Sequence, residues 1–430
     1  MRILFFLIII FSSCYAEKNP VKPLPADQEI KIIFATDLHY IDSSLLEPDS
    51  LLHRALRTGD GKMTHYSPEI VNAFLDEVIR IKPCALVLTG DLTFNGEKKS
   101  HVELAKKLQN VKNAGIPVLA IPGNHDINSP GAYRYLKTSI VSMPNVAKKE
   151  FRALYSPLCA ANTISSDKNS LSYVYKISED VCFMMLDTCQ YERGRVKSGG
   201  KIGNKTLAWM EENLKEAQKS GITVISAMHH NLLLHSSMFR SGFTINNYTQ
   251  VAEIMDRYGV PLNLSGHMHI QHIKRSGEET GIYDIAMNSL TVFPNFFGTL
   301  VIGSDKSIYF KANKVNVAEW AENSGVNDEN LLQFDKYSYS FMNRTILFRM
   351  SERLANVNLE GEQKSAMIEF AQMLNTNYFS GIPSARNENN EKTYDLWKAH
   401  FPHFFTRYFD SILKDSTQST ELHISGTGSR

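Results

Sequence analysis

The sequence predicts an α/β protein: an αββα sandwich of two β-sheets with helices on its outer faces, followed by a C-terminal helical extension. Two observations lead to this fold class. Between residue 29 and about residue 303, short apolar, β-branched runs alternate with longer amphipathic runs. Runs that are apolar on both faces and separated by helices are typical of buried, largely parallel strands. Beyond about residue 315 the strand pattern fades, and apolar residues recur at helical spacing.

The expected strands are short apolar runs, at residues 30–35, 85–88, 117–121, 173–175, 181–186, 223–227 and 261–264. The expected helices between them have one apolar face, and they lie at residues 68–81, 98–114, 207–218 and 251–258. Three later strands are expected to form a second sheet, at residues 283–286, 300–302 and 308–311. Together these elements predict one layered domain over residues 29–305.

The region from 315 to 415 is predicted to be a helical extension that packs on this domain. One apolar stripe contains Met367, Phe370 and Leu374. A second, largely aromatic stripe is expected to be core rather than a ligand site; it comprises Phe404, Phe405, Tyr408, Phe409, Ile412 and Leu413. Residues 416–430 are polar, and a disordered tail is expected there.

The N-terminal residues 1–16 are predicted to be a signal peptide. Arg2 precedes an apolar run at 3–11 that is too short to span a bilayer permanently. Residues 17–28 are expected to be a polar linker, and cleavage before Glu17 is favoured. The segment up to Cys14 also resembles a bacterial lipobox, so acylation of Cys14 stays open, and membrane anchoring is expected only in that case. The sequence therefore predicts an exported protein that is secreted, periplasmic or held at the cell surface.

Four cysteines follow this segment, which allows two disulfides in an exported protein and leaves their pairing open. Cys84 and Cys182 lie in apolar runs and are expected to be buried free thiols. The formal net charge of +1 supplies no basic field for nucleic acid, so no nucleic-acid binding is expected. No phosphate-binding glycine loop is apparent, so no nucleotide cofactor is implied.

Five short polar motifs each follow an expected strand. Because ligands of open α/β sheets bind beyond the carboxyl ends of the strands, we expect the motifs to converge on one rim. They are Asp37-Leu38-His39, Gly90-Asp91, Gly123-Asn124-His125-Asp126, Met228-His229-His230 and Gly266-His267-Met268-His269.

The residue types in these motifs point to a metal centre. Carboxylates, an amide oxygen and imidazoles suit Mn, Fe or Zn better than Ca, which prefers oxygen cages. In Asp-x-His and His-x-His both side chains lie on one face of an extended chain and can reach the same ions. A lone histidine is more often structural than a ligand, and that reading is kept for His101, His235, His272, His400 and His403.

The five motifs, in this order, resemble those of the calcineurin-like metallophosphoesterase family over roughly residues 29–305, and in particular an exported branch similar to cyclic nucleotide phosphodiesterases. The resemblance implies two divalent metal ions (Mn, Fe or Zn) and a hydroxide that bridges them and attacks phosphorus. It assigns Asp91 to both ions and His125 to the substrate phosphate and the leaving oxygen. The remaining implied ligands are Asp37, His39 and His269 for one ion and Asn124, His229 and His267 for the other.

Other positions are left with two interpretations. His229 is taken as the ligand and His230 as a residue of the substrate pocket beside Asn124 and His125, although their order could be reversed. Asp126 either orients His125 or caps a following helix. Tyr40 and Asn95 are further candidates for the pocket wall.

The sequence favours a metal-dependent phosphodiesterase that acts on a phosphate-ester small molecule or on a lipid or nucleotide headgroup. A broad phosphomonoesterase or nucleotidase, or a binding scaffold without activity, are the alternatives. Phe94 stands where purple acid phosphatases have an iron-binding tyrosine, and His125 stands where lipid A precursor pyrophosphatases have arginine. The resemblance therefore disfavours both of these classes.

Overall fold

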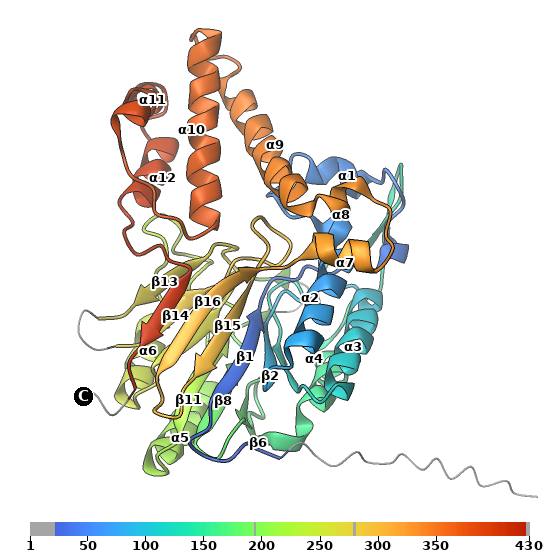
Figure 1. Cartoon of the computed structure of the whole chain (residues 1–430), viewed down its shortest axis with the longest axis vertical. Helices are drawn as coiled ribbons and strands as arrows, with labels where there is room; N and C mark the ends of the chain where they lie inside the picture. Colours follow the sequence, from blue (N-terminus) through green and yellow to red (C-terminus); the bar gives the residue numbers. More distant parts are fainter. Residues whose placement is uncertain (1–21, 193–194, 278–280, 427–430) are drawn as a thin grey trace, which may run out of the picture.

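The computed structural model describes residues 22–192, 195–277 and 281–426 (Figure 1). The predicted signal peptide, Cys14 and the first residues of the linker lie outside them. Two β-sheets pack face to face with helices on both outer sides, and a helical domain stands at one end of this sandwich (Figure 1). The predicted fold class is confirmed.

The first sheet has six strands in the order β17-β16-β15-β1-β2-β3. Strands β1, β2 and β3 are parallel, whereas β15 and β16 run antiparallel to their neighbours. Their bounds are β1 Ile30–Ala35, β2 Ala85–Thr89, β3 Val118–Ile121, β15 Phe296–Ile302, β16 Ile308–Lys314 and β17 Glu421–Ile424.

The second sheet has seven strands in the order β13-β14-β12-β11-β8-β7-β6. Its centre is parallel, from β8 through β11 and β12 to β14. The bounds are β6 Thr163–Ser166, β7 Tyr173–Lys176, β8 Val181–Leu186, β11 Thr223–Met228, β12 Leu262–Ser265, β13 His272–Arg275 and β14 Tyr283–Ala286. The prediction of one sheet built from 283–286, 300–302 and 308–311 is wrong. The first of these strands pairs with β12, while the other two extend the sheet of β1, because strand partners are chosen by long-range pairing.

The central strands are buried on both faces, as their continuous apolar sequence predicts. Ile32 and Phe34 of β1 contribute to the apolar layer between the sheets, together with Phe183 of β8. Ile33 of β1 instead belongs to the layer under the helices, with Phe74 of α2. Each large apolar side chain buried in this way contributes about 1.5–3 kcal/mol to stability. Because successive side chains of a strand point to opposite faces, β1 contributes residues to two separate cores.

Helices α2 and α3 cover the first sheet, and helices α5 and α6 cover the second. These four are α2 Ser67–Ile81, α3 Lys98–Asn113, α5 Asn204–Lys219 and α6 Tyr248–Arg257. Shorter elements complete the sandwich domain: α1 Leu51–Leu56, α4 Lys148–Tyr155, and the hairpins β4 Tyr133–Tyr135 with β5 Ile140–Ser142 and β9 Tyr191–Glu192 with β10 Arg195–Val196.

The C-terminal domain is helical, with a long pair, α9 and α10, side by side (Figure 1). Phe409 and Ile412 of the aromatic stripe are buried in its core with Trp397, while Phe404 is 53% exposed. Part of the predicted stripe is therefore core. The helices are α7 Val317–Asn323, α8 Glu329–Leu332, α9 Phe334–Leu354, α10 Gly361–Phe379, α11 Glu388–His400 and α12 Phe404–Leu413.

The prediction of a disordered tail is wrong for residues 421–424. These residues form strand β17, which pairs antiparallel with β16, so that Phe310 lies opposite Leu422 and Ile308 opposite Ile424. Leu422 and Ile424 point to the same face of the strand and pack against the apolar layer between the sheets. Two apolar residues in a polar tail are a weak local signal for a strand. The strand forms nevertheless, because the free edge of the sheet supplies partners for its backbone hydrogen bonds.

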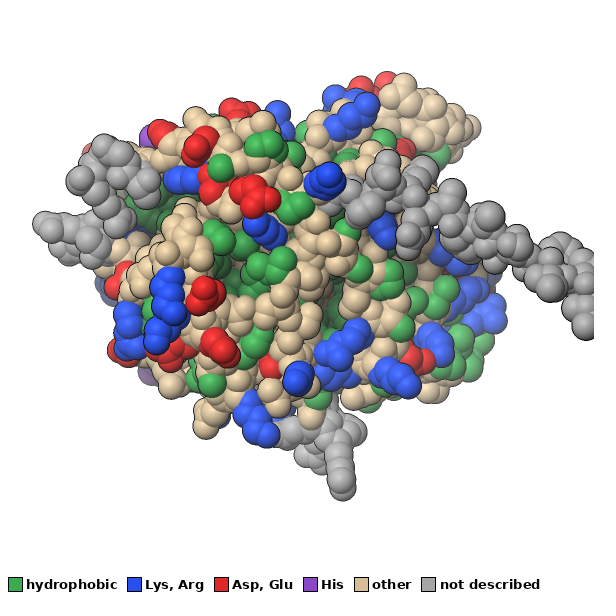
Figure 2. All heavy atoms as spheres, turned by 90° about the horizontal axis from the view of Figure 1, so that it is seen from below, with side chains coloured by type: hydrophobic (Ala, Val, Ile, Leu, Met, Phe, Trp, Pro, Cys, Tyr) green, Lys and Arg blue, Asp and Glu red, His purple; other side chains and the backbone are tan. Residues whose placement is uncertain are grey.

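Cys84, Cys159, Cys182 and Cys189 are all free thiols, so neither of the two possible disulfides is present among them. Seen from below, at the end opposite the helical domain, basic and acidic side chains are interspersed over the surface (Figure 2). Among the described residues, no helix has the length and apolar character needed to cross a membrane.

Candidate metal centre

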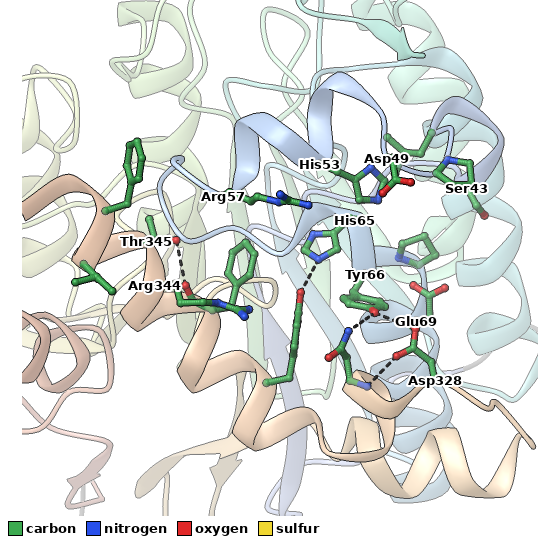
Figure 3. Close-up of a pocket in the computed structure, with 18 of the residues that line it drawn as sticks. Ser43, Asp49, His53, Arg57, His65, Tyr66, Glu69, Asp328, Arg344 and Thr345 are labelled. Carbon is green, nitrogen blue, oxygen red and sulfur yellow. Dashed lines mark hydrogen bonds between the residues drawn. The ribbon is translucent and has the colours of Figure 1, made fainter. Parts of the chain in front are cut away.

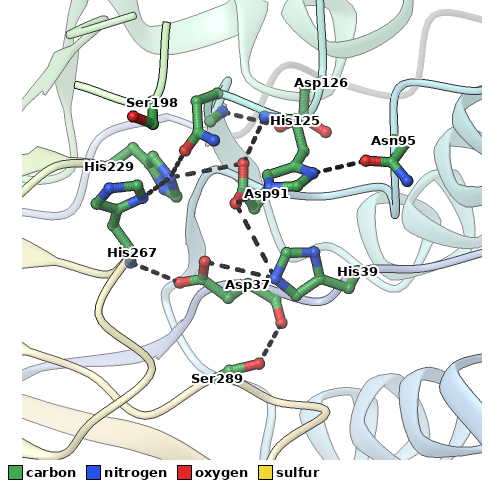
Figure 4. Close-up of polar contacts among 12 residues, drawn as sticks. Asp37, His39, Asp91, Asn95, His125, Asp126, Ser198, His229, His267 and Ser289 are labelled. Carbon is green, nitrogen blue, oxygen red and sulfur yellow. Dashed lines mark hydrogen bonds and ion pairs between the residues drawn. The ribbon is translucent and has the colours of Figure 1, made fainter. Parts of the chain in front are cut away.

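The five polar motifs all begin where a strand ends, and the structure brings them together (Figure 4). They do not lie on the rim of a single sheet. Asp37, Asp91 and Asn124 follow β1, β2 and β3 of the first sheet, whereas His229 and His267 follow β11 and β12 of the second. The site therefore lies across the carboxyl ends of both sheets.

The backbone at these strand ends adopts the left-handed conformation, which non-glycine residues rarely do. The φ angle is 51° at Asp37, 40° at His39 and 46° at Asp91, and it is 69° at His267 and 60° at His269. Each such turn redirects a side chain from the strand direction into the site. Because this conformation is unfavourable, the surrounding contacts must hold it in place.

The first group of ligand atoms comes from Asp37, His39, His269 and Asp91, and these atoms lie within 4.8 Å of one another. His269 Nε2 is 3.2 Å from Asp37 Oδ1 and 3.1 Å from His39 Nε2. The second oxygen of Asp37 accepts hydrogen bonds from the Thr36 hydroxyl and the His267 backbone N–H. Asp37 is thereby oriented with one oxygen facing the two imidazoles.

The second group gathers around His229. Its Nε2 is 3.0 Å from Asn124 Oδ1 and 3.2 Å from His267 Nδ1. The opposite ring nitrogens are occupied, because His229 Nδ1 lies 2.8 Å from the Thr89 carbonyl and His267 Nε2 lies 2.8 Å from the Gly242 carbonyl. A backbone carbonyl on one ring nitrogen makes the other an acceptor that can ligate a metal.

Asp91 stands between the two groups (Figure 4). Its Oδ1 is 3.5 Å from His229 Nε2, while its Oδ2 is 4.0 Å from His39 Nε2. The side chain is buried, and its backbone segment is pressed against Gly123, where a Cβ atom would lie only 2.2 Å from Asp91 Oδ1. Glycine at that position is what allows the two loops to approach so closely.

The protonation states of these residues fit metal binding. Burial raises the pKa of Asp37, but His269, His229 and His39 outweigh it and hold that pKa well below its usual value. Burial, with Lys62 nearby, lowers the pKa of His39 well below its usual value. Burial lowers the pKa of His229, yet the carboxylates of Asp91 and Asp37 outweigh it and raise that pKa. The lowered pKa values of Asp37 and His39 favour ionised carboxylate and neutral imidazole, the forms that ligate metal. The raised pKa of His229 shows that the two carboxylates favour a positive charge at the centre.

The fit to metal ions rests on the donor set itself. Imidazole nitrogens approach one another and carboxylate oxygens at 3.1–3.5 Å. Buried His39 Nδ1 has no hydrogen-bond partner. Nitrogen and oxygen donors of this kind match divalent transition metals, so the described residues fit the two ions expected from the sequence.

His125 lies at the open side of this cluster, with its side chain 32% exposed. Its Nδ1 is 2.8 Å from Asn95 Oδ1, which leaves Nε2 directed toward the site, 3.9 Å from Asp91 Oδ2. Its backbone N–H donates to Asp91 Oδ1. Asn95 therefore orients His125, a role that the sequence analysis did not assign to it.

His230 lies beside the second group but has both ring nitrogens engaged. Its Nδ1 is 2.8 Å from the Thr188 hydroxyl, and its Nε2 is 2.9 Å from the Ser198 carbonyl. Of the adjacent pair, His229 presents the nitrogen nearer to Asn124 and Asp91. Tyr40, the other candidate for the pocket wall, is 2% exposed and packs in the core under α2 instead.

Neither interpretation of Asp126 is correct. Its carboxylate accepts hydrogen bonds from the backbone N–H groups of Leu92, Thr93 and Gly123 and from the Thr93 hydroxyl. It therefore ties the loop after β2 to the loop after β3. Burial, together with nearby Asp91, raises the pKa of Asp126 to about 7. His101, read as structural, is buried and contacts Tyr155 and the Asp126 carbonyl.

Lys62 was missed by the sequence analysis. It lies in the loop before α2, pairs with Asp60 at 2.9 Å and is only 12% exposed. Its charge acts on His39 and on His125, which places a cation beside the open side of the centre. No motif or periodicity marks this residue, so only the path of the loop reveals it.

Comparison with known proteins agrees with this geometry. Residues 30–271 match the calcineurin-like phosphoesterase family, and residues 316–419 match the C-terminal domain of cyclic nucleotide phosphodiesterase. The chain belongs to the calcineurin-like phosphoesterase family. No curated protein matches the sequence.

Solved structures share the fold at low sequence identity. A dimetal phosphatase from Danio rerio superposes with a TM-score of 0.50 and 12% identity, over 66% of this chain and 95% of that one. A purple acid phosphatase from yellow lupin seeds gives a TM-score of 0.40 and 11% identity, over 69% of this chain and 52% of that one. The first of these likenesses supports the fold of the sandwich.

Proposed function

We propose that this protein hydrolyses phosphate diesters at a centre of two divalent cations. One cation would be held by Asp37, His39 and His269, and the other by Asn124, His229 and His267. The observation that carries the proposal is the position of Asp91, whose two oxygens face different ligand groups. A single carboxylate placed in this way is the bridge that a pair of cations requires.

A pair of cations held there supplies an acidified water for attack on phosphorus and neutralises phosphoryl charge. The protein's own part is orientation and proton transfer. The Thr89 and Gly242 carbonyls fix the rings of His229 and His267. Asn95 Oδ1 accepts from His125 Nδ1–H and holds Nε2 toward the site. In its protonated form the ring can donate from Nε2 to the departing oxygen, and burial lowers the pKa of that form. Lys62 adds positive charge beside an anionic substrate.

A cyclic nucleotide is the proposed substrate. Support comes from the match of residues 316–419 to the C-terminal domain of cyclic nucleotide phosphodiesterase. A lipid or nucleotide headgroup shares the diester chemistry, and a broad phosphomonoesterase or nucleotidase uses the same centre. A scaffold without activity is disfavoured because every ligand position is filled.

The test is a substrate panel with the purified full-length protein loaded with Mn, Zn or Fe. It compares 2′,3′- and 3′,5′-cyclic nucleotides and bis-p-nitrophenyl phosphate with p-nitrophenyl phosphate and nucleoside monophosphates. We expect the highest kcat/KM on a cyclic nucleotide. A preference for monoesters would replace the proposed substrate class, and inactivity on the whole panel with both cations bound would remove the enzymatic proposal.

We also propose that the protein is exported through the segment at residues 1–16. The support is the charge and apolar pattern of that segment. N-terminal sequencing of the mature protein from the exported fraction tests it, and Cys14→Ala separates acylation from simple cleavage. An unprocessed N-terminus in the cytoplasm would contradict export.

A further inference from the structure

A second cavity lies between the two domains, away from the metal centre (Figure 3). Its volume is about 1110 Å³, which is large enough for a small organic ligand. One wall comes from the 43–69 segment of the sandwich domain and the other from α8 and α9 of the helical domain. None of the residues that line it belongs to the two ligand groups of the metal centre.

The charges in this cavity are separated. Arg57 and Arg344 lie toward one end, and Glu69 and Asp328 lie toward the other (Figure 3). Neither guanidinium has an ionic partner within the described part of the chain, although Arg344 lies 5.8 Å from the centre of the Tyr337 ring. A guanidinium group can bind a phosphate or carboxylate through two parallel hydrogen bonds, so these two groups at one end of the cavity are available to an anion.

Aromatic rings form the wall of the cavity between its two ends. Tyr66 and Tyr337 are packed edge to face with ring centres 5.4 Å apart, and the His65 ring lies 5.4 Å from that of Phe341. Rings arranged in this way offer both faces and edges to a flat heterocycle. A simple inorganic anion would leave this wall unused.

Two buried polar atoms of the lining have no partner. They are Nδ1 of His65 and Oε2 of Glu69, whereas His65 Nε2 is engaged with the Tyr337 hydroxyl at 2.8 Å. Burial lowers the pKa of His65 to about 4, so its ring is neutral near pH 7. Buried polar atoms are almost always hydrogen-bonded, so these two atoms are positions that a water molecule or a polar group of a ligand would satisfy.

We propose that this cavity is a second binding site, separate from the metal centre, for a nucleoside monophosphate. The phosphate would lie at Arg57 and Arg344, the base against Tyr66 and Tyr337, and the hydroxyl or amino donors of the ligand at Glu69. A nucleoside monophosphate carries an anionic group at one end, a flat ring, and hydrogen-bond donors elsewhere. The cavity offers arginines, aromatic rings and a carboxylate at correspondingly separate positions. This proposal does not depend on which ester the metal centre hydrolyses.

The test is calorimetric titration of the full-length, metal-loaded protein with adenosine 5′-monophosphate, adenosine and inorganic phosphate. The variants are Arg57→Gln/Arg344→Gln for the cavity, Asp37→Asn for the metal centre and Arg353→Gln as a control. Arg353 is an exposed arginine of the same helix α9 outside the lining. Because Arg57 and Arg344 are exposed and unpaired, their replacement should leave the fold intact, which an unchanged melting temperature would verify.

We expect the wild type, Arg353→Gln and Asp37→Asn to bind adenosine 5′-monophosphate equally, and the double variant to bind it at least about tenfold more weakly. Adenosine and phosphate alone should each bind more weakly than the nucleotide. The proposal is overturned if the wild type does not bind the nucleotide, or if the double variant binds it as tightly as the wild type. It is equally overturned if Asp37→Asn abolishes binding, because the nucleotide would then occupy the metal centre.

Discussion

His235 and His272 face each other through their Nδ1 atoms, 2.8 Å apart, in the interior of the protein. The pair continues at both ends, because His235 Nε2 is 3.0 Å from Asp284 Oδ2 and His272 Nε2 is 2.8 Å from Asp415 Oδ2. Three hydrogen bonds in this chain require three protons, and two neutral imidazoles carry only two. Two neutral imidazoles therefore satisfy two of the three contacts at a time. The chain joins the second sheet to the segment after α12.

Removing Asp415 should loosen this connection. We expect Asp415→Ala to lower the free energy of unfolding by about 2 kcal/mol, since it removes a hydrogen bond to a charged group, and Asp415→Asn to cost less. Asp395→Ala, which removes an exposed carboxylate of α11, serves as the control. Urea unfolding at pH 7 measures the difference, and equal stability of Asp415→Ala and the control would refute the structural role.

The same chain predicts a loss of stability in acid. Burial lowers the pKa of His272, and although burial raises the pKa of Asp415, the hydrogen bond and charge of His272 hold it well below its usual value. A buried histidine with a lowered pKa loses stability as the pH falls below about 6.5, and a carboxylate with a lowered pKa does so below about 4. Wild-type stability should therefore decline from pH 6.5 downward, and less steeply in His272→Gln. Parallel curves for the two proteins would contradict this.

Asp91→Asn should remove the bridge between the two ligand groups. We expect turnover to fall on the order of a thousandfold or more, because several kcal/mol of charge stabilisation depend on both cations. Metal analysis should show fewer than two cations per chain in the variant. The control is Asp256→Asn, a change of an exposed carboxylate on α6. Two bound cations and wild-type turnover in Asp91→Asn would rule out the proposed bridge.

Lys62→Met should weaken substrate binding more than the chemical step. The lysine is 12% exposed and close to His39 and His125, so its charge acts on an anionic ligand with little screening. We expect KM to rise about five- to tenfold with a smaller change in kcat. Lys106→Met, at an exposed lysine of α3 that is 69% exposed, is the comparison. Steady-state kinetics decide, and an unchanged KM would remove Lys62 from the substrate site.

Asn95→Ala should affect His125 without removing it. The amide oxygen of Asn95 is 2.8 Å from His125 Nδ1 and fixes which nitrogen faces the site. We expect kcat to fall about 10- to 100-fold on substrates with a poor leaving group, with metal content unchanged. Activity on an ester with a good leaving group such as p-nitrophenol should fall much less, since little protonation is needed. An equal loss on both esters would indicate a general structural effect instead.

Much of the local structure was predictable from the sequence. The strands at 30–35 and 181–186 have the predicted bounds, because runs that are apolar on both faces can be buried only inside a layered fold. The five motifs were also recognisable, since each polar cluster follows directly on an apolar strand. The rule that carboxyl ends of parallel strands share an edge brings together the three motifs of the first sheet and, separately, the two motifs of the second.

The sequence by itself therefore determined most strands and helices of the sandwich and which residues are able to ligate metal. Only the tertiary structure decided that the centre lies across two sheets, that β14 joins β12 while β15 joins β1, and that residues 421–424 close the edge of the first sheet. It also decided that Lys62 approaches the centre and that Asp415 reaches His272. Local periodicity in the sequence indicates which side chains are buried. The contacts named here join residues far apart in the chain. They depend on which segments still have unpaired backbone hydrogen-bonding groups and exposed apolar surface once the layers have assembled.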